Sequence, residues 1–339
     1  MVAGIEGDGL AKPGDKALVL GASGFLGSHV VKALVAAGRD VRVMVRASSD
    51  TTTIDDLPVE RCIGDVLDPV SLRAAMTGCQ VVYYCVVDTR AWLRDSTPLR
   101  RVNIDGLRNV LAIAMELPLR KFVYTSTIVT IGLNPSGVAS ERDAFNWADR
   151  APDYVALRVQ AEQEFLACCR RGLPGVACCV GTTYGAGDQQ PTPHGKLIEL
   201  VVQGKMPVYW SSGLSVVGIE DAAAAMLLAE RYGVDGERYI ISDRYMTMRE
   251  LATMAAGFAG VKPPALPIPI WLMYGGCWVA QGVCVLLNKD SELVPKSLRL
   301  ARIMADFDNS KARRELHWQP RPFEQSVAEA VSWFQRKLG

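Results

Sequence analysis

The sequence predicts an α/β fold, a doubly wound parallel sheet followed by a smaller C-terminal lobe. Strands and helices alternate from residue 16 to about residue 185, and a glycine-rich turn follows the first strand. The strands are near-continuous apolar runs, which is typical of parallel strands that helices cover on both faces. The alternation breaks after residue 185, so the rest of the chain is expected to form the lobe.

Composition and charge exclude two classes of protein. The 339 residues include 37 Lys and Arg and 36 Asp and Glu, which gives a net charge of +1, and 49% of the residues are hydrophobic. Such a chain is too apolar and too weakly charged for intrinsic disorder. It also lacks the cationic surplus that would displace counterions from nucleic acid, so we expect no nucleic-acid partner.

The nine cysteines and the N-terminus predict a cytoplasmic protein. The cysteine count is odd, with two adjacent pairs and no Cys-x-x-Cys, which fits neither a disulfide framework nor a zinc site. Residues 1–15 lack the basic and apolar regions of a signal peptide and are predicted to be a flexible leader.

Apolar periodicity predicts each element of the first domain, residues 16–185, in order. The expected strands are 16–20, 40–46, 59–63, 80–87, 121–126 and 176–180. The expected helices are 28–37, which ends at Gly38, 70–76, 98–115 and 154–169.

Residues 186–339 are expected to form mainly the lobe, with segments from 215–245 returning to the first domain. The predicted helices here are 192–203, 217–232, 247–258, 309–316 and 322–337, with a strand at 238–242.

Residues 263–287, called the apolar stretch below, contain no charged residue. Their length would suit a membrane span, but prolines and glycines interrupt them. Three interpretations stay open: an apolar lid over a substrate, a packed helix or dimer face, and a peripheral membrane contact. In the first, Trp271 and Tyr274 would contact an apolar substrate.

The glycine turn predicts a dinucleotide site. Gly21 permits a tight turn, Gly24 lets a pyrophosphate approach the backbone, and Gly27 lets the helix pack on the sheet. The neighbouring Ser23, Phe25 and Leu26 would contact the same cofactor. The alternative is a strand–helix turn without a ligand. The context of strand, glycines, helix and strand favours a Rossmann-type site.

Two positions predict the choice of dinucleotide. Arg46 ends the second strand, where an acidic residue would bind the ribose of NAD, and Arg42 precedes it on the same face. NADP(H) is therefore favoured, with NAD(H) as the alternative, unless Arg46 is only a solvated surface residue. Asp65 and Val66 follow the third strand and would reach the adenine, although Asp65 would also serve as a turn former.

Four segments carry a family resemblance: 21–27, 64–68, 101–110 and 123–127. From about residue 16 to 333 the chain resembles the extended short-chain dehydrogenase/reductases of the NAD-dependent epimerase/dehydratase superfamily. It is similar to the dihydroflavonol-reductase-like and 3β-hydroxysteroid-dehydrogenase-like branch. The nearest pattern is that of the hopanoid-associated sugar epimerase group, in which "epimerase" is a family label.

The resemblance implies three catalytic positions, filled here by Thr127, Tyr154 and Arg158. The hydroxyl of the first would bind the substrate oxygen, and the tyrosine would exchange a proton with it. The family has lysine at the third position, to lower the tyrosine pKa and hold the nicotinamide ribose. Arginine keeps the charge but has a different shape and does not deprotonate.

Further positions follow from the same comparison. Thr125, Val86 and Val180 would border the cofactor, and Val180 stands where the family usually has proline. Ser126, Trp92 and His194 are substrate candidates. The alternative, structural interpretations are that Trp92 caps the core and that His194 is an ordinary loop residue. His29 is expected to be a packing residue, and the three separated histidines predict no metal site.

Three functions stay open at this point. The first is an NADP(H)-dependent oxidoreductase that interconverts a ketone and a secondary alcohol on an apolar, steroid-, terpenoid- or flavonoid-like molecule. The second is a nucleotide-sugar epimerase or dehydratase, against which the uncharged apolar stretch argues. The third is a dinucleotide-binding protein with lost or non-redox chemistry, which Arg158 and Val180 favour. The resemblance also implies a homodimer formed through helices 98–115 and 154–169.

Overall fold

The computed structural model describes residues 15–93, 95–135, 137–269, 271–273, 275–277 and 305–338. The predicted leader, except for Asp15, lies outside the described residues. So do Tyr274 and the part of the apolar stretch from residue 278 onward.

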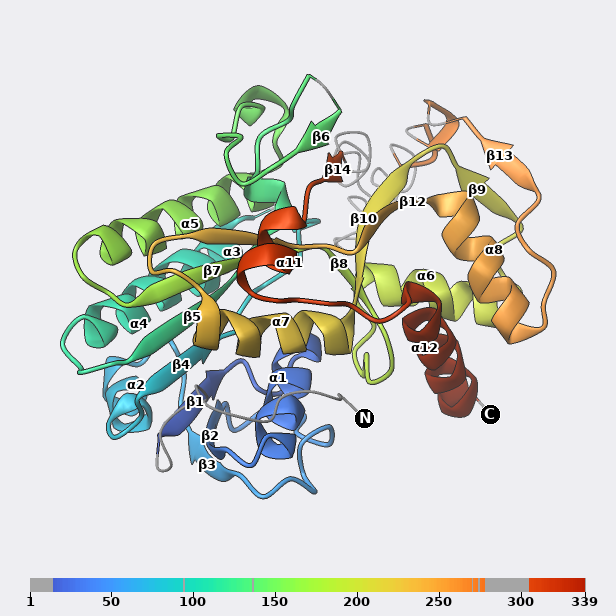
Figure 1. The fold of residues 1–339 in the computed structure, drawn as a ribbon. Helices are drawn as coiled ribbons and strands as arrows, with labels where there is room; N and C mark the ends of the chain where they lie inside the picture. Colours follow the sequence, from blue (N-terminus) through green and yellow to red (C-terminus); the bar gives the residue numbers. More distant parts are fainter. Residues whose placement is uncertain are drawn as a thin grey trace.

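Strands from residues 16–241 build a seven-stranded sheet in the order β11-β7-β5-β4-β1-β2-β3 (Figure 1), and every neighbouring pair is parallel. The strands are β1 (Lys16–Leu20), β2 (Asp40–Val45), β3 (Glu60–Ile63), β4 (Val81–Tyr84), β5 (Lys121–Thr127), β7 (Gly175–Val180) and β11 (Arg238–Ile241). The chain winds outward from β1 in one direction and from β4 in the other. The predicted doubly wound fold is confirmed, and its switch point lies between β1 and β4.

Helices cover both faces of the sheet because successive strand residues point to opposite sides. Val19 packs in one core with α1 (Phe25–Ala36) and α7 (Ile219–Tyr232). Its neighbours Leu18 and Leu20 pack in the other core. The helices of that second core are α2 (Pro69–Met76), α4 (Leu107–Ala114) and α5 (Asp153–Arg170).

The predicted single helix 98–115 has a change of pitch. It consists of α3 (Thr97–Arg100), a π-helical segment (Arg101–Gly106) and α4. Within the π segment, the Asn103 side chain accepts a hydrogen bond from the backbone N–H of Asp88 and donates one to its carbonyl, at 2.9 and 3.0 Å. Local π segments often occur beside functional sites, and this one fixes the chain that leaves β4.

The lobe contains strands that apolar periodicity did not predict. A three-stranded sheet is formed by β12 (Arg244–Thr247), β10 (Gly213–Gly218) and β8 (Thr182–Tyr184). The predicted helix 217–232 therefore begins only at Ile219, since the preceding residues pair as a strand. Two short pairs were also missed: β9 (Val208–Trp210) with β13 (Leu266–Ile268), and β6 (Val138–Ala139) with β14 (Asp306–Phe307).

Three helices pack together in the lobe, α6 (Pro193–Val202), α8 (Met248–Ala259) and α12 (Phe323–Leu338). In Figure 1 the lobe occupies the right side of the molecule and the parallel sheet the left. The boundary predicted at residue 185 places β8 in the first domain, whereas β8 pairs with β10 in the lobe sheet.

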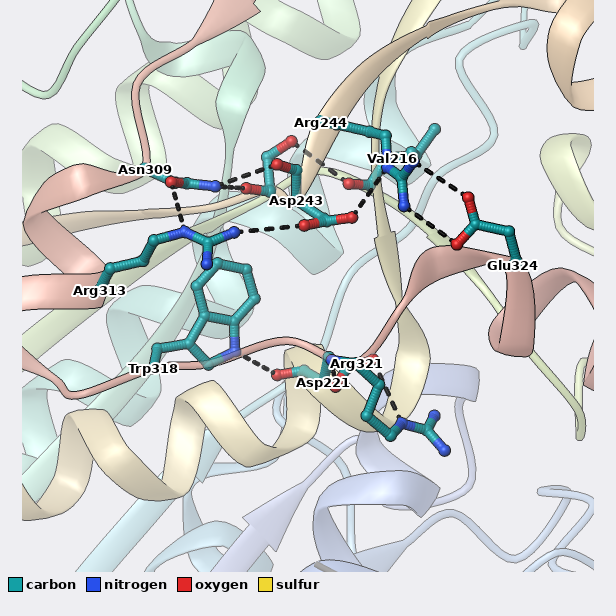
Figure 2. Close-up of polar contacts among 10 residues, drawn as sticks. Val216, Asp221, Asp243, Arg244, Asn309, Arg313, Trp318, Arg321 and Glu324 are labelled. Carbon is teal, nitrogen blue, oxygen red and sulfur yellow. Dashed lines mark hydrogen bonds and ion pairs between the residues drawn. The ribbon is translucent and has the colours of Figure 1, made fainter.

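A polar network fastens the C-terminal segment across both parts (Figure 2). The short helix α11 (Ser310–Glu315) packs against β11, and Arg313 contacts Asp243 at 3.3 Å. Asp243 also accepts from Arg244 at 3.1 Å, and Arg244 pairs with Glu324 of α12. Further along the segment, the buried indole of Trp318 donates to the carbonyl of Asp221. The segment thereby fixes the lobe relative to the parallel sheet.

Candidate cofactor and active site

A cavity of about 700 Å³, called the cofactor cavity below, opens between the carboxyl ends of the parallel strands and the lobe. This is where doubly wound folds bind ligands, and the volume lies in the range of small-molecule sites. Fourteen predicted site residues line it: Ser23, Gly24, Phe25, Leu26, Gly27, Arg46, Trp92, Thr125, Ser126, Thr127, Tyr154, Arg158, Val180 and His194.

The glycine turn has the geometry of a phosphate cradle. Gly21 adopts φ +82°, and a Cβ on it would lie 2.7 Å from the carbonyl carbon of Cys85. A Cβ on Gly27 would lie 2.1 Å from the Gly21 carbonyl oxygen. Gly24 precedes α1, and no side chain caps the first turn of this helix. The helix N–H groups thus remain available to a pyrophosphate, so the residues present fit a dinucleotide.

The two arginines of the second strand have different environments. The exposed Arg46 side chain lines the cofactor cavity beside Ser48 and Ser49. The Arg42 guanidinium instead donates to Glu60 and to the carbonyls of Ala75 and Thr77, all at 2.8 Å. Arg42 is therefore engaged within the protein. β2 ends at Val45, one residue before the predicted end, and Arg46 directly after it lines the cavity.

Four predicted cofactor residues are not among the lining residues: Gly21, Asp65, Val66 and Val86. Gly21 lies behind the lining residues, where its backbone packs closely against the backbone of Cys85 and Val86. The Asp65 carboxylate accepts from the Leu67 N–H at 2.9 Å, which is the turn-forming arrangement. The Val66 carbonyl accepts from Asn109 at 3.0 Å, so both residues shape the loop after β3. Direct contact with a cofactor stays a prediction for them.

Tyr154 lies in the first turn of α5, and Thr127 ends β5 at the same cavity. Burial raises the pKa of the Tyr154 phenol above its usual value. The Arg158 cation acts in the opposite direction, and the Asp88 carboxylate adds to the rise. Among its neighbours, Arg158 therefore supplies the charge that favours the phenolate.

The Arg158 side chain is buried and is hydrogen-bonded to the end of β5. One Nη donates to the Thr125 carbonyl at 2.7 Å, and the guanidinium lies 5.9 Å from the Tyr124 ring centre. Its Nε has no hydrogen-bond partner among the described residues. Burial opposes the charge, but the phenols of Tyr124, Tyr154 and Tyr84 raise the pKa of Arg158, so it remains a cation.

Two predicted substrate residues have unexpected environments. The Ser126 hydroxyl donates to the buried carboxylate of Glu162, so this group is occupied within the protein. Trp271 is 70% exposed and is not among the described residues that line the cofactor cavity, so its contact with a substrate stays a prediction.

His194 and His29, two of the three histidines, differ in environment. His194 is half-buried in the cavity wall beside Tyr184, and burial lowers the pKa of its imidazole to about 4. Its ring is thus neutral near pH 7 and offers one donor and one acceptor. His29 contacts the carbonyl of Ala186 at 2.9 Å and so joins α1 to the loop after β8, as expected of a packing residue.

Sequence reasoning missed two carboxylates: one lines the cavity, and the other lies between Val87 and Thr89, which line it. Asp88, held by Asn103, pairs with Arg90 at 2.6 Å. Asp188 lines the cavity and accepts from the N–H and the hydroxyl of Thr192, at 2.9 and 2.8 Å. Asp88 was detectable, because a polar residue directly after an apolar strand of a parallel sheet lies at the ligand edge. Asp188 follows an irregular loop and gives no comparable signal.

The described residues contain neither a metal-binding cluster nor a membrane-spanning helix. No group of three or more His, Cys, Asp or Glu side chains there is arranged to hold a metal ion. No helix in that part of the chain combines the length and apolar character that crossing a bilayer requires.

The doubly wound sheet, with a glycine turn at its switch point, defines a Rossmann-type dinucleotide-binding protein. The chain belongs to the NAD dependent epimerase/dehydratase family, whose model matches residues 17–242. An NAD(P) dinucleotide is the cofactor typical of this family. The predicted resemblance to the extended short-chain dehydrogenase/reductases is confirmed at this level.

Relatives match over most of the chain. It is 30% identical to a putative dihydroflavonol 4-reductase of Synechocystis sp. over 322 residues, 94% of each protein. It is 30% identical to sterol demethylase protein B of Methylococcus capsulatus, over 94% of this chain and 98% of that protein. The crystal structure of gox2253 superposes with a TM-score of 0.84 at 31% identity, covering 95% and 98% of the two chains.

Proposed function

We propose that the protein is an NADP(H)-dependent oxidoreductase that interconverts a ketone and a secondary alcohol on an apolar, steroid-, terpenoid- or flavonoid-like molecule. The observation that carries this proposal is that Thr127, Tyr154 and Arg158 line one cavity with the glycine turn. The names of the relatives add support, since they include a dihydroflavonol reductase, a sterol demethylase component and a 3β-hydroxysteroid dehydrogenase. The proposal places the chain in that branch, near the hopanoid-associated sugar epimerase pattern.

When bound, the dinucleotide supplies or accepts the hydride. In reduction, the Thr127 hydroxyl would donate a hydrogen bond to the substrate carbonyl oxygen. The Tyr154 phenol would transfer its proton to this oxygen as the carbonyl carbon gains hydride, and a secondary alcohol results. The buried cation of Arg158 would stabilise the phenolate left on Tyr154. In oxidation, the phenolate would take the proton back.

The test is NADPH turnover. Purified protein is incubated with NADPH and a panel of ketosteroids, flavanonols and simple ketones, and the nicotinamide absorbance is followed. Loss of absorbance with one substrate class supports the proposal. Tight NADPH binding without turnover across the panel, unchanged in Arg158→Lys, would overturn it in favour of a dinucleotide-binding protein without redox chemistry.

A nucleotide-sugar epimerase is the second candidate, and the polar lobe wall of the cavity favours it. Gln189, Gln190 and Thr192 line that wall with uncharged hydrogen-bonding groups, which suit a hydroxylated substrate. An epimerase returns the hydride to its own substrate. Interconversion of UDP-hexose isomers in the presence of NAD(P)+, without net reduction of that dinucleotide, would therefore identify this activity.

Arg46 is expected to determine coenzyme preference. Replacing it in Arg46→Gln removes a charged donor from the predicted 2′-phosphate position, so the preference for NADPH over NADH should fall roughly tenfold or more. Fluorescence titration with both coenzymes measures this ratio. Arg42→Gln is the matched control, because Arg42 is engaged with Glu60 and should leave the ratio unchanged. An unchanged ratio in Arg46→Gln would contradict the NADP assignment.

Arg158 should control the pH dependence of alcohol oxidation. Oxidation needs the Tyr154 phenolate, so the rate rises as pH passes the Tyr154 pKa. The Arg158 cation lowers that pKa. Arg158→Met should therefore move the limb of the pH–kcat profile to higher pH, whereas Arg158→Lys should hold it near the wild-type position. A limb that stays in place in Arg158→Met would show that Arg158 does not act on the tyrosine.

A further inference from the structure

A buried carboxylate lies beneath the proposed catalytic residues, outside the cavity itself. Glu162 is four residues after Arg158 and eight after Tyr154 on α5, so the three side chains share one face of the helix. Glu162 is only 3% exposed and is not among the described residues that line the cofactor cavity. It therefore contacts neither substrate nor cofactor.

Four donors from other elements converge on the Glu162 carboxylate. One oxygen accepts from the hydroxyls of Ser126 and Thr130, the latter at 2.8 Å, and from the Cys179 thiol at 3.4 Å. The other oxygen accepts from the Arg238 guanidinium at 3.0 Å. The donors come from β5, the short 3-10 helix after it, β7 and β11. One side chain thus fastens α5 to three neighbouring strands of the sheet.

The position of these contacts matters for the site. Ser126 lies between Thr125, whose carbonyl holds Arg158, and Thr127. Cys179 directly precedes Val180, which also lines the cavity. The carboxylate therefore holds the helix that carries Tyr154 and Arg158 against the strand end that carries Thr127. Buried charges are tolerated where they are paired and hydrogen-bonded, and Arg238 provides that pairing.

We infer that Glu162 is a positioning residue for the proposed reaction: it fixes Tyr154 and Arg158 relative to Thr127. This inference rests on the proposed function. It makes Glu162 important for chemistry at the nicotinamide end of the cavity and unimportant for the adenine and pyrophosphate end, which the glycine turn and Arg46 form.

The test compares Glu162→Gln with two variants. The glutamine has nearly the same shape but lacks the charge and presents an amide N–H₂ to groups that donate. Glu164→Gln is the matched control: Glu164 is also ion-paired on α5, with Arg108 at 2.7 Å, but on its outer side. Arg238→Gln removes the distal partner, together with the hydrogen bond from Arg238 to the Glu141 carbonyl, and leaves Glu162 bound to Ser126, Thr130 and Cys179.

For the best substrate of the panel, Glu162→Gln should lower kcat about tenfold or more, while KM and the Kd for NADPH change less than about threefold. Glu164→Gln should match the wild type. Arg238→Gln should lower the Tm at least as much as Glu162→Gln but reduce kcat less. The decrease in kcat can be compared with the decrease in Tm for Glu162→Gln and for Arg238→Gln. If kcat fell by the same factor per degree of lost Tm in both variants, Glu162 would have only a structural role, and the inference would be overturned.

A second readout separates this inference from the proposed function. If the wild type turns over no substrate, the proposed function fails, but the emission of bound NADPH still reports the environment of its nicotinamide. Glu162→Gln should then change the emission intensity and lifetime at unchanged Kd, and Glu164→Gln should not. Identical emission in wild type and Glu162→Gln would overturn the positioning role, whatever the activity.

Discussion

Tyr154→Phe is expected to lower kcat for ketone reduction by roughly 100- to 10,000-fold, the range over which a positioned general acid contributes. The substitution removes one oxygen and keeps the ring, which packs against apolar neighbours of both the sheet core and the loop after β5. The fold and the Kd for NADPH should therefore change little. Stopped-flow measurement of NADPH oxidation and fluorescence titration of NADPH separate the two quantities.

Tyr232→Phe serves as the control, because this tyrosine is a partly exposed residue at the end of α7. It should retain wild-type kcat. If Tyr154→Phe kept more than about a third of the wild-type rate, Tyr154 would not be the proton donor. His194 would then be the next group to examine, since it is the neutral imidazole in the cavity wall.

Gly27→Ala is expected to damage both stability and cofactor binding. The added Cβ would lie 2.1 Å from the Gly21 carbonyl oxygen, a backbone atom that cannot turn aside. The start of α1 must shift, which should cost about 3 kcal/mol of unfolding free energy, at the upper end of the range for overpacking. The same shift moves the first-turn N–H groups, so NADPH affinity should fall about tenfold or more.

Gly257→Ala is a matched control in the lobe. Gly257 is exposed within α8, and its added Cβ would meet no atom within 4 Å. This variant should gain roughly 0.5–1 kcal/mol, because alanine loses less conformational entropy in a helix. Urea unfolding and NADPH titration of both variants make the comparison. NADPH affinity retained in Gly27→Ala would show that the turn does not hold the pyrophosphate.

Local patterns predict the sheet and its helices well, because most of the strands are buried apolar runs and the helices that cover them have an apolar face. The lobe was predicted less well. Residues 213–218 read equally as a strand or as the start of a helix, and their pairing with β8 and β12 depends on contacts between distant segments. Short strands such as β9 and β13 carry too few residues to show a period.

The candidate site divides in the same way. Backbone-dependent positions, such as the glycine turn, are predictable because only glycine fits them. The hydrogen-bond partners of individual side chains cannot be predicted in this way. Nothing local distinguishes Arg42, which binds Glu60, from Arg46, which faces the cavity. Likewise, the direction of the Ser126 hydroxyl depends on Glu162, 36 residues away in the chain.

The strand order has a consequence for how the molecule can be assembled. The sheet edge beside β7 is covered by β11, which the chain supplies only after it has passed through β8, α6 and β10 of the lobe. Ending the chain near residue 185 would leave the wholly buried apolar strand β7 as an open edge, ready to pair with other molecules. α11 then packs against β11 before the chain enters the lobe again as α12. The two parts are interleaved in the chain, so neither is an autonomous folding unit, and we expect the protein to fold and unfold as one cooperative body.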